Sequence, residues 1–200
     1  MIRRHVFVVA AAALLLGPPI ALAQTPDRAL VEALGSVYRL TDYTAFDWIS
    51  GYYQRGVLTL QGFVRTPRLK QRAEDAVRKA QGVEEVVNRL EVLPAHSGDD
   101  DLRVAAYIAV YGGSALERYA PGGQLSGAMI SELRDTARFG LEGTEVGRGP
   151  HAIHILVSGS RVVLQGEVRT TGDRQIAEAR VRTLSGVLGV TNQLRVAAQK

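Results

Sequence analysis

An internal repeat constrains the fold of this 200-residue chain more than any other feature. Residues 60–66 read LQGFVRT, and residues 164–170, 104 positions later, read LQGEVRT. The register then continues without a gap, so that 17 of the 36 positions from 57 to 92 are identical in both copies. A period of 104 residues is too long for a stacked-repeat solenoid. The sequence therefore predicts two copies of one small domain.

Each copy begins with a predicted hairpin. Apolar residues or glycine occupy every second position of residues 58–64 and 162–168, a period that indicates a strand with one buried face. A preceding strand is expected to end at Gly56 in the first copy and at Gly159 in the second, because glycine suits a tight turn.

A helix and a third strand complete each copy. Thr66 is the predicted N-cap of the first helix and Pro67 its first residue. Gly82 and Gly186 are expected to end the two helices in a left-handed conformation. The third strands are predicted at residues 86–92 and 190–196.

The predicted fold class is α/β (α+β). A strand–helix–strand connection crosses over right-handedly, so the third strand should lie parallel to the second. One further helix per copy is expected, at residues 26–35 with Leu30, Val31 and Leu34 on one side, and at residues 102–111 with three aspartates, 99–101, as caps. The result would be two tandem small sandwiches, each a three-stranded mixed sheet with helices on one face.

The predicted boundaries divide the chain into a signal peptide at residues 1–23, a first domain at 24–93, a linker at 94–99 and a second domain at 100–200. The second domain carries an insert at about residues 122–149 that has no counterpart in the first copy. It consists of an amphipathic helix, expected to pack on its own domain, and a glycine-rich loop. The apolar residues of this helix are Leu125, Met129, Ile130, Leu133 and Ala137.

The N-terminal segment has the features of a secretory signal peptide. Arg3 and Arg4 precede an apolar run at residues 6–16, and small residues follow at Ala21 and Ala23. The run is too short to cross a bilayer, and the small residues suit cleavage after Ala23. The sequence therefore predicts export to the periplasm; an uncleaved membrane anchor is the alternative.

Composition excludes several classes of site. The chain has no cysteine, which excludes disulfides, thiolate metal sites and a cysteine-linked lipid anchor. The predicted signal peptide holds two of the 24 basic residues and none of the 20 acidic ones, so the exported chain would have a net charge of +2. This small excess, together with export, argues against a nucleic-acid partner.

The repeated unit consists of a hairpin, a helix with an alanine face, a Gly-Val pair and a Val-x-Asn-x-Leu-x-Val strand. In the first copy its residues are Leu60, Gly62, Val64, Ala73, Gly82, Val83, Val86, Asn88, Leu90 and Val92. In the second copy they are Leu164, Gly166, Val168, Ala177, Gly186, Val187, Val190, Asn192, Leu194 and Val196. This pattern resembles the BON domain, named for bacterial osmotically inducible and nodulation-related periplasmic proteins.

The resemblance implies an α/β fold, a periplasmic location and non-catalytic binding to phospholipid or envelope surfaces. The expected partner is an anionic phospholipid headgroup, and the expected role is maintenance of the envelope under osmotic stress. The alternative is a protein-interaction adaptor or chaperone-like module for another envelope protein.

Basic residues gather on both repeated helices. The predicted lipid-binding residues are Arg68, Arg72 and Lys79 in the first copy, Arg174 and Arg182 in the second, and Trp48. Each basic side chain near an anionic membrane contributes about 1 kcal/mol, and a tryptophan ring suits the headgroup interface. The alternative for the basic residues is an ordinary solvated helix face with ion pairs. Most of the aromatic residues between 43 and 53 are expected to be core or strand residues.

Two residue pairs have predicted structural roles. Asn88 and Asn192 are in phase with the buried strand positions, and they are expected to tie down the nearby glycine turn rather than bind a ligand. Gly62 and Gly166 are expected to let the helix or a neighbouring strand approach closely.

No catalytic, cofactor or metal site is predicted. His151 and His154 are three residues apart, which on a strand places them on opposite faces, and no carboxylate or thiol stands at ligand spacing nearby. The sequence has no Gly-x-Ser-x-Gly elbow and no phosphate-binding glycine loop. We therefore expect a binding protein and not an enzyme.

Overall fold

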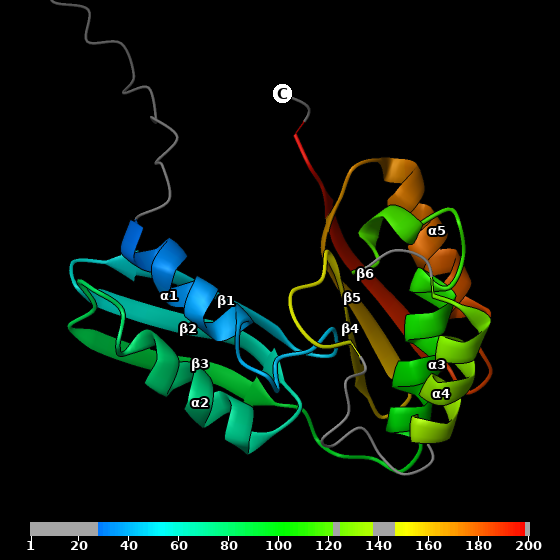
Figure 1. The fold of residues 1–200 in the computed structure, drawn as a ribbon, viewed down its shortest axis with the longest axis horizontal. Helices are drawn as coiled ribbons and strands as arrows, with labels where there is room; N and C mark the ends of the chain where they lie inside the picture. The colour runs from blue at the N-terminus through cyan, green and yellow to red at the C-terminus, as the bar shows by residue number, and fades with distance from the viewer. Residues whose placement is uncertain (1–27, 122–124, 138–146, 199–200) are drawn as a thin grey trace, which may run out of the picture.

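The computed structural model describes residues 28–121, 125–137 and 147–198. The predicted signal peptide with its cleavage site, and part of the predicted glycine-rich loop, lie outside these residues. The described residues form two units, each a three-stranded mixed sheet with helices on one face (Figure 1). The predicted fold class is confirmed.

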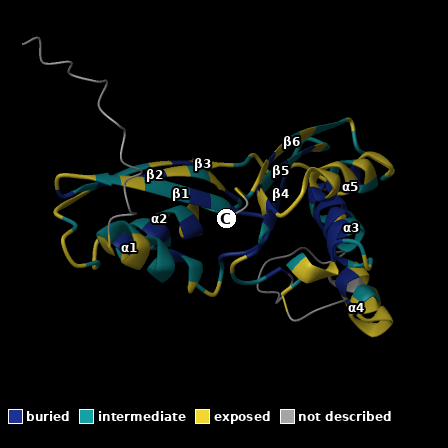
Figure 2. Cartoon of the chain, turned by 90° about the horizontal axis from the view of Figure 1, so that it is seen from above, coloured by how far each residue is buried: buried dark blue, intermediate teal, exposed yellow. Residues whose placement is uncertain are grey.

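The first unit runs from α1 to β3. Its elements are α1 (Arg28–Tyr38), β1 (Trp48–Gln54), β2 (Val57–Val64), α2 (Pro67–Val77) and β3 (Glu85–Val92). In the sheet, β2 lies between an antiparallel β1 and a parallel β3. Figure 2 shows this sheet and its two helices as separate layers.

The second unit repeats this topology and adds an insert. Its elements are α3 (Asp99–Tyr111), the short 3₁₀ helix η1 (Glu117–Tyr119), α4 (Gly127–Ala137), β4 (Ile153–Ser158), β5 (Arg161–Val168), α5 (Thr171–Arg182) and β6 (Gly189–Val196). Helix α3 packs on α5 and β4, as α1 packs on α2 and β1. Helix α4 belongs to the insert and packs on α3, with Leu133 buried.

Both hairpins turn through two residues with positive φ. These are Arg55 and Gly56 (50° and 84°) in the first unit, and Gly159 and Ser160 (56° and 62°) in the second. Positive φ at both central residues is the type I′ geometry that matches the twist of paired strands. The predicted hairpins therefore form at the predicted glycines.

The repeated helices begin as predicted but end earlier. The Thr66 hydroxyl accepts a hydrogen bond from the Leu69 N–H at 3.1 Å, ahead of Pro67. Helices α2 and α5 end at Val77 and Arg182, so the prediction that Gly82 and Gly186 end them is wrong. Both glycines do have left-handed φ values, 87° and 85°, in the turn that leads to the third strand. Their conformation serves that turn instead of the helix end.

The predicted aspartate caps of α3 are also wrong. The N-cap is Gly98, and the three aspartates form the first helical turn, where negative charge suits the helix dipole. The buried Asp99 carboxylate instead accepts hydrogen bonds from the N–H groups of Gly159 and Ser160, at 3.0 and 3.1 Å. The start of α3 is thereby tied to the β4–β5 turn.

The packing face of α1 differs from the predicted one. Leu30 and Leu34 contact the core, but Val31 is 58% exposed. Because the helix continues to Tyr38, its buried face follows positions 30, 33, 34 and 37, and Val31 lies about 100° away from it. The fully buried residues are Ala33 and Val37.

Gly62 and Gly166 mark a close approach between strands. A Cβ atom at Gly62 would lie 2.0 Å from the Trp48 carbonyl oxygen, and one at Gly166 would lie 2.1 Å from the Ala152 carbonyl oxygen. Both glycines have φ 130°, a conformation that favours glycine. The approaching backbone belongs to the first residue of β1 at Gly62, and to the residue just before β4 at Gly166.

The repeated asparagines join the third strand to the helix. The Asn88 amide donates to the Lys70 carbonyl and to the Glu74 carboxylate, both at 3.0 Å. The Asn192 amide makes the equivalent bonds to Arg174 and Glu178, at 2.9 and 3.0 Å. The predicted partner, the glycine turn, is therefore wrong: each amide points across the sheet face to the middle of the helix.

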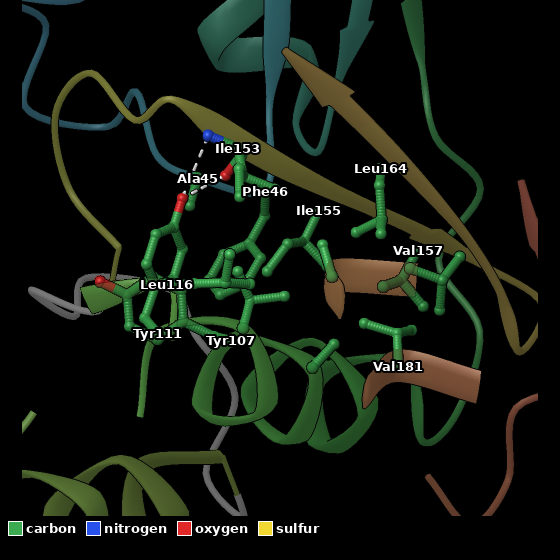
Figure 3. Close-up of a cluster of buried hydrophobic side chains, with 14 of the residues drawn as sticks. Ala45, Phe46, Tyr107, Tyr111, Leu116, Ile153, Ile155, Val157, Leu164 and Val181 are labelled. Carbon is green, nitrogen blue, oxygen red and sulfur yellow. Dashed lines mark hydrogen bonds between the residues drawn. The ribbon is translucent and has the colours of Figure 1, made fainter. Parts of the chain in front are cut away.

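A segment of the first unit inserts into the core of the second. We call residues 43–47 the crossing segment; its Ala45 and Phe46 pack among Tyr107, Ile155 and other residues of the second core (Figure 3). The Ala45 N–H donates to the Gly147 carbonyl at 2.6 Å, and the Ile155 N–H donates to the Ala45 carbonyl at 2.7 Å. The crossing segment therefore covers part of the free edge of β4.

The buried carboxylate of Asp47 fixes the backbone conformation of the crossing segment through hydrogen bonds. Asp47 accepts from the Thr44 hydroxyl at 2.6 Å and from the N–H groups of Thr44 and Arg65, at 3.1 and 2.8 Å. Burial raises the pKa of Asp47, and these hydrogen bonds oppose that effect. The carboxylate thus joins the crossing segment to the end of β2.

The close approach at Gly166 can be tested by adding one methyl group. In Gly166→Ala the Cβ would meet the Ala152 carbonyl oxygen, so we expect the free energy of unfolding to fall by at least about 2 kcal/mol. Urea denaturation followed by circular dichroism measures this change. Gly189→Ala is the control, because a Cβ there meets nothing within 4 Å. Equal, small losses in both variants would contradict the close approach.

The crossing segment can be tested with two phenylalanines. Phe46 is fully buried, whereas Phe63 is 36% exposed. We expect Phe46→Ala to lower the free energy of unfolding by about 3–5 kcal/mol and Phe63→Ala by much less. Amide hydrogen exchange should show that Phe46→Ala reduces protection in β4 and β5. Loss of protection confined to the first unit would contradict the insertion.

Candidate functional site

The predicted basic residues lie on two helices that are far apart. Arg68, Arg72 and Lys79 belong to α2 or the turn after it, and Arg174 and Arg182 belong to α5. The two helices cover different sheets and are well separated in both views (Figures 1 and 2). The structure therefore does not bring these residues into one surface.

Two of these five charges are compensated by a neighbouring carboxylate. Arg72 pairs with Asp42 at 2.7 Å and Arg182 with Glu178 at 2.6 Å. Hydrogen bonds from Asn192 and then Arg182 lower the pKa of Glu178, in keeping with a stable carboxylate there. Arg68 and Lys79 are exposed, and their side chains make no hydrogen bond or ion pair within the described part of the chain.

Trp48 lies apart from the basic helices. It starts β1 and is half-buried, with its ring edge-on to His154 at a centroid distance of 5.1 Å. This position is the junction between the two units. Of the predicted lipid-binding residues, Trp48 is therefore the one placed between the sheets.

The structure also presents an apolar residue that sequence reasoning missed. Leu188 is 73% exposed, the highest value among the large hydrophobic residues that the structure describes. Its N–H donates to the Ser160 carbonyl at 2.9 Å, which joins the α5–β6 loop to the β4–β5 turn. We call residues 159–160 and 183–188 the apolar tip; exposed Arg161 and Arg182 border it.

A sequence signal for the apolar tip was present in the repeat. Position 188 is the equivalent of position 84, and the first copy has Glu84 there. The repeat thus replaces a charged residue by a large apolar one at a loop position that the structure shows to be exposed. Comparing the copies at the positions where they differ would have identified it.

The two histidines lie side by side, which corrects the prediction that they occupy opposite faces. Strand β4 begins at Ile153, so His151 precedes it and strand alternation does not govern its direction. The ring centroids of His151 and His154 are 6.4 Å apart. Within the described ranges no group of three or more histidine, aspartate or glutamate side chains is arranged to hold a metal ion.

Both histidines are buried in an aromatic junction. His151 Nε2 lies 3.2 Å from the Tyr107 hydroxyl and its Nδ1 lies 2.9 Å from the Gly149 carbonyl oxygen. His154 Nε2 lies 3.5 Å from the Tyr43 hydroxyl, and its Nδ1 has no partner among the described residues. Burial lowers the pKa of His154 to about 4, and the nearby His151 adds to this effect.

A groove of about 780 Å³ runs beside this junction. The first unit lines it with Trp48, Ser50 and Gln61, and the second with His151, Gln165, Glu167 and Arg195, among others. Six of the lining residues lie on the sheet faces that the helices leave open, as the strand registers show: Trp48, Ser50, Gln61, Gln165, Glu167 and Arg195. Gly51 and Gly166 instead are register partners of the buried Leu60 and Leu194. The groove therefore lies between the two open sheet faces, and both polar side chains and the Trp48 ring line it.

The junction has a predicted pH dependence. The pKa of His154 is about 4 in the folded chain and near 6.5 in the unfolded chain. The unfolded chain therefore binds a proton at His154 at a higher pH than the folded chain does. The free energy of unfolding has its full value above pH 6.5, and a part of order 3 kcal/mol is lost as the pH falls toward 4.

We expect the free energy of unfolding, measured in urea, to fall more steeply between pH 7 and pH 4.5 for the wild type than for His154→Leu. Leucine has a similar volume but cannot be protonated. Parallel profiles for the two proteins would contradict the role of His154.

Two solved structures cover 84% of this chain at 12% identity: CdsD, a structural protein of the type III secretion system of Chlamydia trachomatis (TM-score 0.26, 92% of that chain), and the C-terminal domain of CdsD (TM-score 0.24, 98% of that chain). No curated protein matches the sequence. No helix of the described residues has the length and apolar character needed to span a membrane.

The family comparison covers both units. The model of the BON domain matches residues 27–94 and residues 133–198. The second match begins inside α4, although α3 occupies the place that α1 has in the first unit. Together the matches span two thirds of the chain, and the duplicated topology agrees with them. This chain is a member of the BON domain family, with two BON domains.

Proposed function

We propose that this chain is an exported, non-catalytic protein that associates peripherally with anionic phospholipid. BON domain proteins are typically periplasmic and envelope-associated, and the N-terminal sequence suits a signal peptide cleaved after Ala23. Maintenance of the envelope under osmotic stress is part of this proposal and rests on the family alone. The apolar tip carries the phospholipid part.

The apolar tip has the chemistry of a weak membrane contact. Moving an exposed leucine such as Leu188 into the acyl boundary is worth roughly 1.5–3 kcal/mol. Arg161 beside it would add about 1 kcal/mol near anionic headgroups. The Asp99 carboxylate holds the turn beneath Leu188, so little ordering of that turn is needed on contact. The expected association is therefore reversible and sensitive to salt.

A second candidate function is a protein-interaction adaptor. The observation that favours it is the open face of the first sheet, where Tyr52 and Phe63 are both substantially exposed. Exposed aromatic residues are typical anchors of protein interfaces. A stoichiometric partner captured from the periplasm, without vesicle binding, would favour this function.

Vesicle co-sedimentation tests the lipid proposal. We expect the purified exported protein to pellet with vesicles that contain phosphatidylglycerol, to pellet much less with pure phosphatidylcholine, and to be released by salt. Leu188→Glu, which introduces the residue of the first copy, should reduce binding about ten-fold or more. Met129→Ser is the matched control, because Met129 is an exposed apolar residue of α4.

Two outcomes would contradict this proposal. Equal pelleting with neutral and anionic vesicles, or none with either, would remove the lipid function. Loss of binding in Arg68→Glu with Lys79→Glu, but not in Leu188→Glu, would move the contact from the apolar tip to α2.

A further inference from the structure

The groove between the open sheet faces has the size of a ligand site. Its volume of about 780 Å³ falls within the range of about 300–1,000 Å³ that is usual for small-molecule sites. The apolar tip lies at the start of β5 and the groove near its end, about 20 Å apart along the strand. The groove is therefore a separate site from the proposed membrane contact.

Two repeat-equivalent glutamines face this groove. Gln61 lines it from the first unit and Gln165, 104 residues later, lines it from the second. Neither carboxamide makes a hydrogen bond within the described residues, and neither side chain points to a core. Each carboxamide offers both an N–H donor and a carbonyl acceptor. The two units thus each contribute one glutamine carboxamide without an intramolecular hydrogen bond among the described residues to the same groove.

Trp48 provides the apolar surface of the groove. It is the single tryptophan of the chain, and its edge packs on the buried His154. The close approach of Gly62 to the Trp48 carbonyl holds its backbone in place. The other small wall residues, Gly51, Ala152 and Gly166, provide no pocket for a large apolar group.

The charges that line the groove balance each other. Glu167 and Arg195 are register partners on β5 and β6, and both line the groove. The described lining holds no other aspartate, glutamate, lysine or arginine. A balanced pair gives no net attraction for an anionic headgroup or a nucleic acid, but its planar groups can hydrogen-bond to hydroxyls.

We propose that this groove binds an oligosaccharide that carries N-acetyl groups. An acetamido group offers one donor and one acceptor, the complement of a glutamine carboxamide. The C–H face of a pyranose ring is apolar and matches the face of Trp48, while its hydroxyls match Glu167 and Arg195. An extended peptide would find the same amides, but the groove gives it no side-chain pocket.

Tryptophan fluorescence tests this inference in the wild-type protein, because Trp48 is the sole tryptophan and reports from the groove itself. With tetra-N-acetylchitotetraose as the probe, we expect a saturable change in emission and a matching calorimetric titration. Gln61→Ala and Gln165→Ala should each weaken binding about ten-fold. Gln193→Ala is the control, since Gln193 is exposed beside Gln165 but does not line the groove.

The titration has three outcomes that would overturn the inference. These are no saturable change with the N-acetylated probe, equal affinity for cellotetraose, which lacks acetamido groups, and binding of an unstructured polar peptide but not of the sugar. Circular dichroism of each variant shows whether it is folded. Binding that survives in Leu188→Glu while vesicle pelleting is lost would separate this site from the proposed lipid contact.

Discussion

The burial of Phe46 is the interaction on which the arrangement of the two units depends. Phe46 belongs to the first unit, yet its side chain is fully buried in the second core, with its ring centroid 5.9 Å from that of Tyr107. Backbone hydrogen bonds of the preceding residue, Ala45, to Gly147 and Ile155 hold the chain next to it. Burying a phenylalanine stabilises by roughly 1.5–3 kcal/mol. The connection between the domains is therefore a packed contact as well as a covalent linker.

Several features of the junction follow from that contact. His154 points to the open face of the second sheet, but Tyr43 and Trp48 of the first unit pack against it, and it is buried. Part of the free β4 edge is also covered, which removes a site where another strand could pair. Beside the covered part, a groove remains between the two open faces. The crossing segment thus contacts the buried His154 through Tyr43 and covers part of the β4 edge through Ala45, and the groove lies beside this junction.

The predictions that succeeded depend on short-range patterns, and those that failed depend on distant neighbours. Alternation and turn glycines identified the strands and hairpins because each signal acts within a few residues. The strand pattern predicted that Asn88 lies on the core-facing side of its strand. It could not predict the hydrogen-bond partners Lys70 and Glu74, because they lie on a helix and the strand pattern does not say where that helix packs. His151 was assigned to a strand that begins two residues later, so its side-chain direction was wrong. The exposure of Leu188 depends on where a loop leaves the core.

The sequence by itself determined the duplication, the strand and helix order of each unit and membership of the BON domain family. These features follow from the order and spacing of residue types along the chain, which can be compared directly between the two copies. The tertiary structure decided which surfaces can act. It placed α2 and α5 apart, paired Arg72 and Arg182 with carboxylates, exposed Leu188 and brought Gln61 and Gln165 to one groove. The physical reason is that a periodic pattern specifies which face of an element is apolar, whereas the packing of one element on another specifies which polar face remains free.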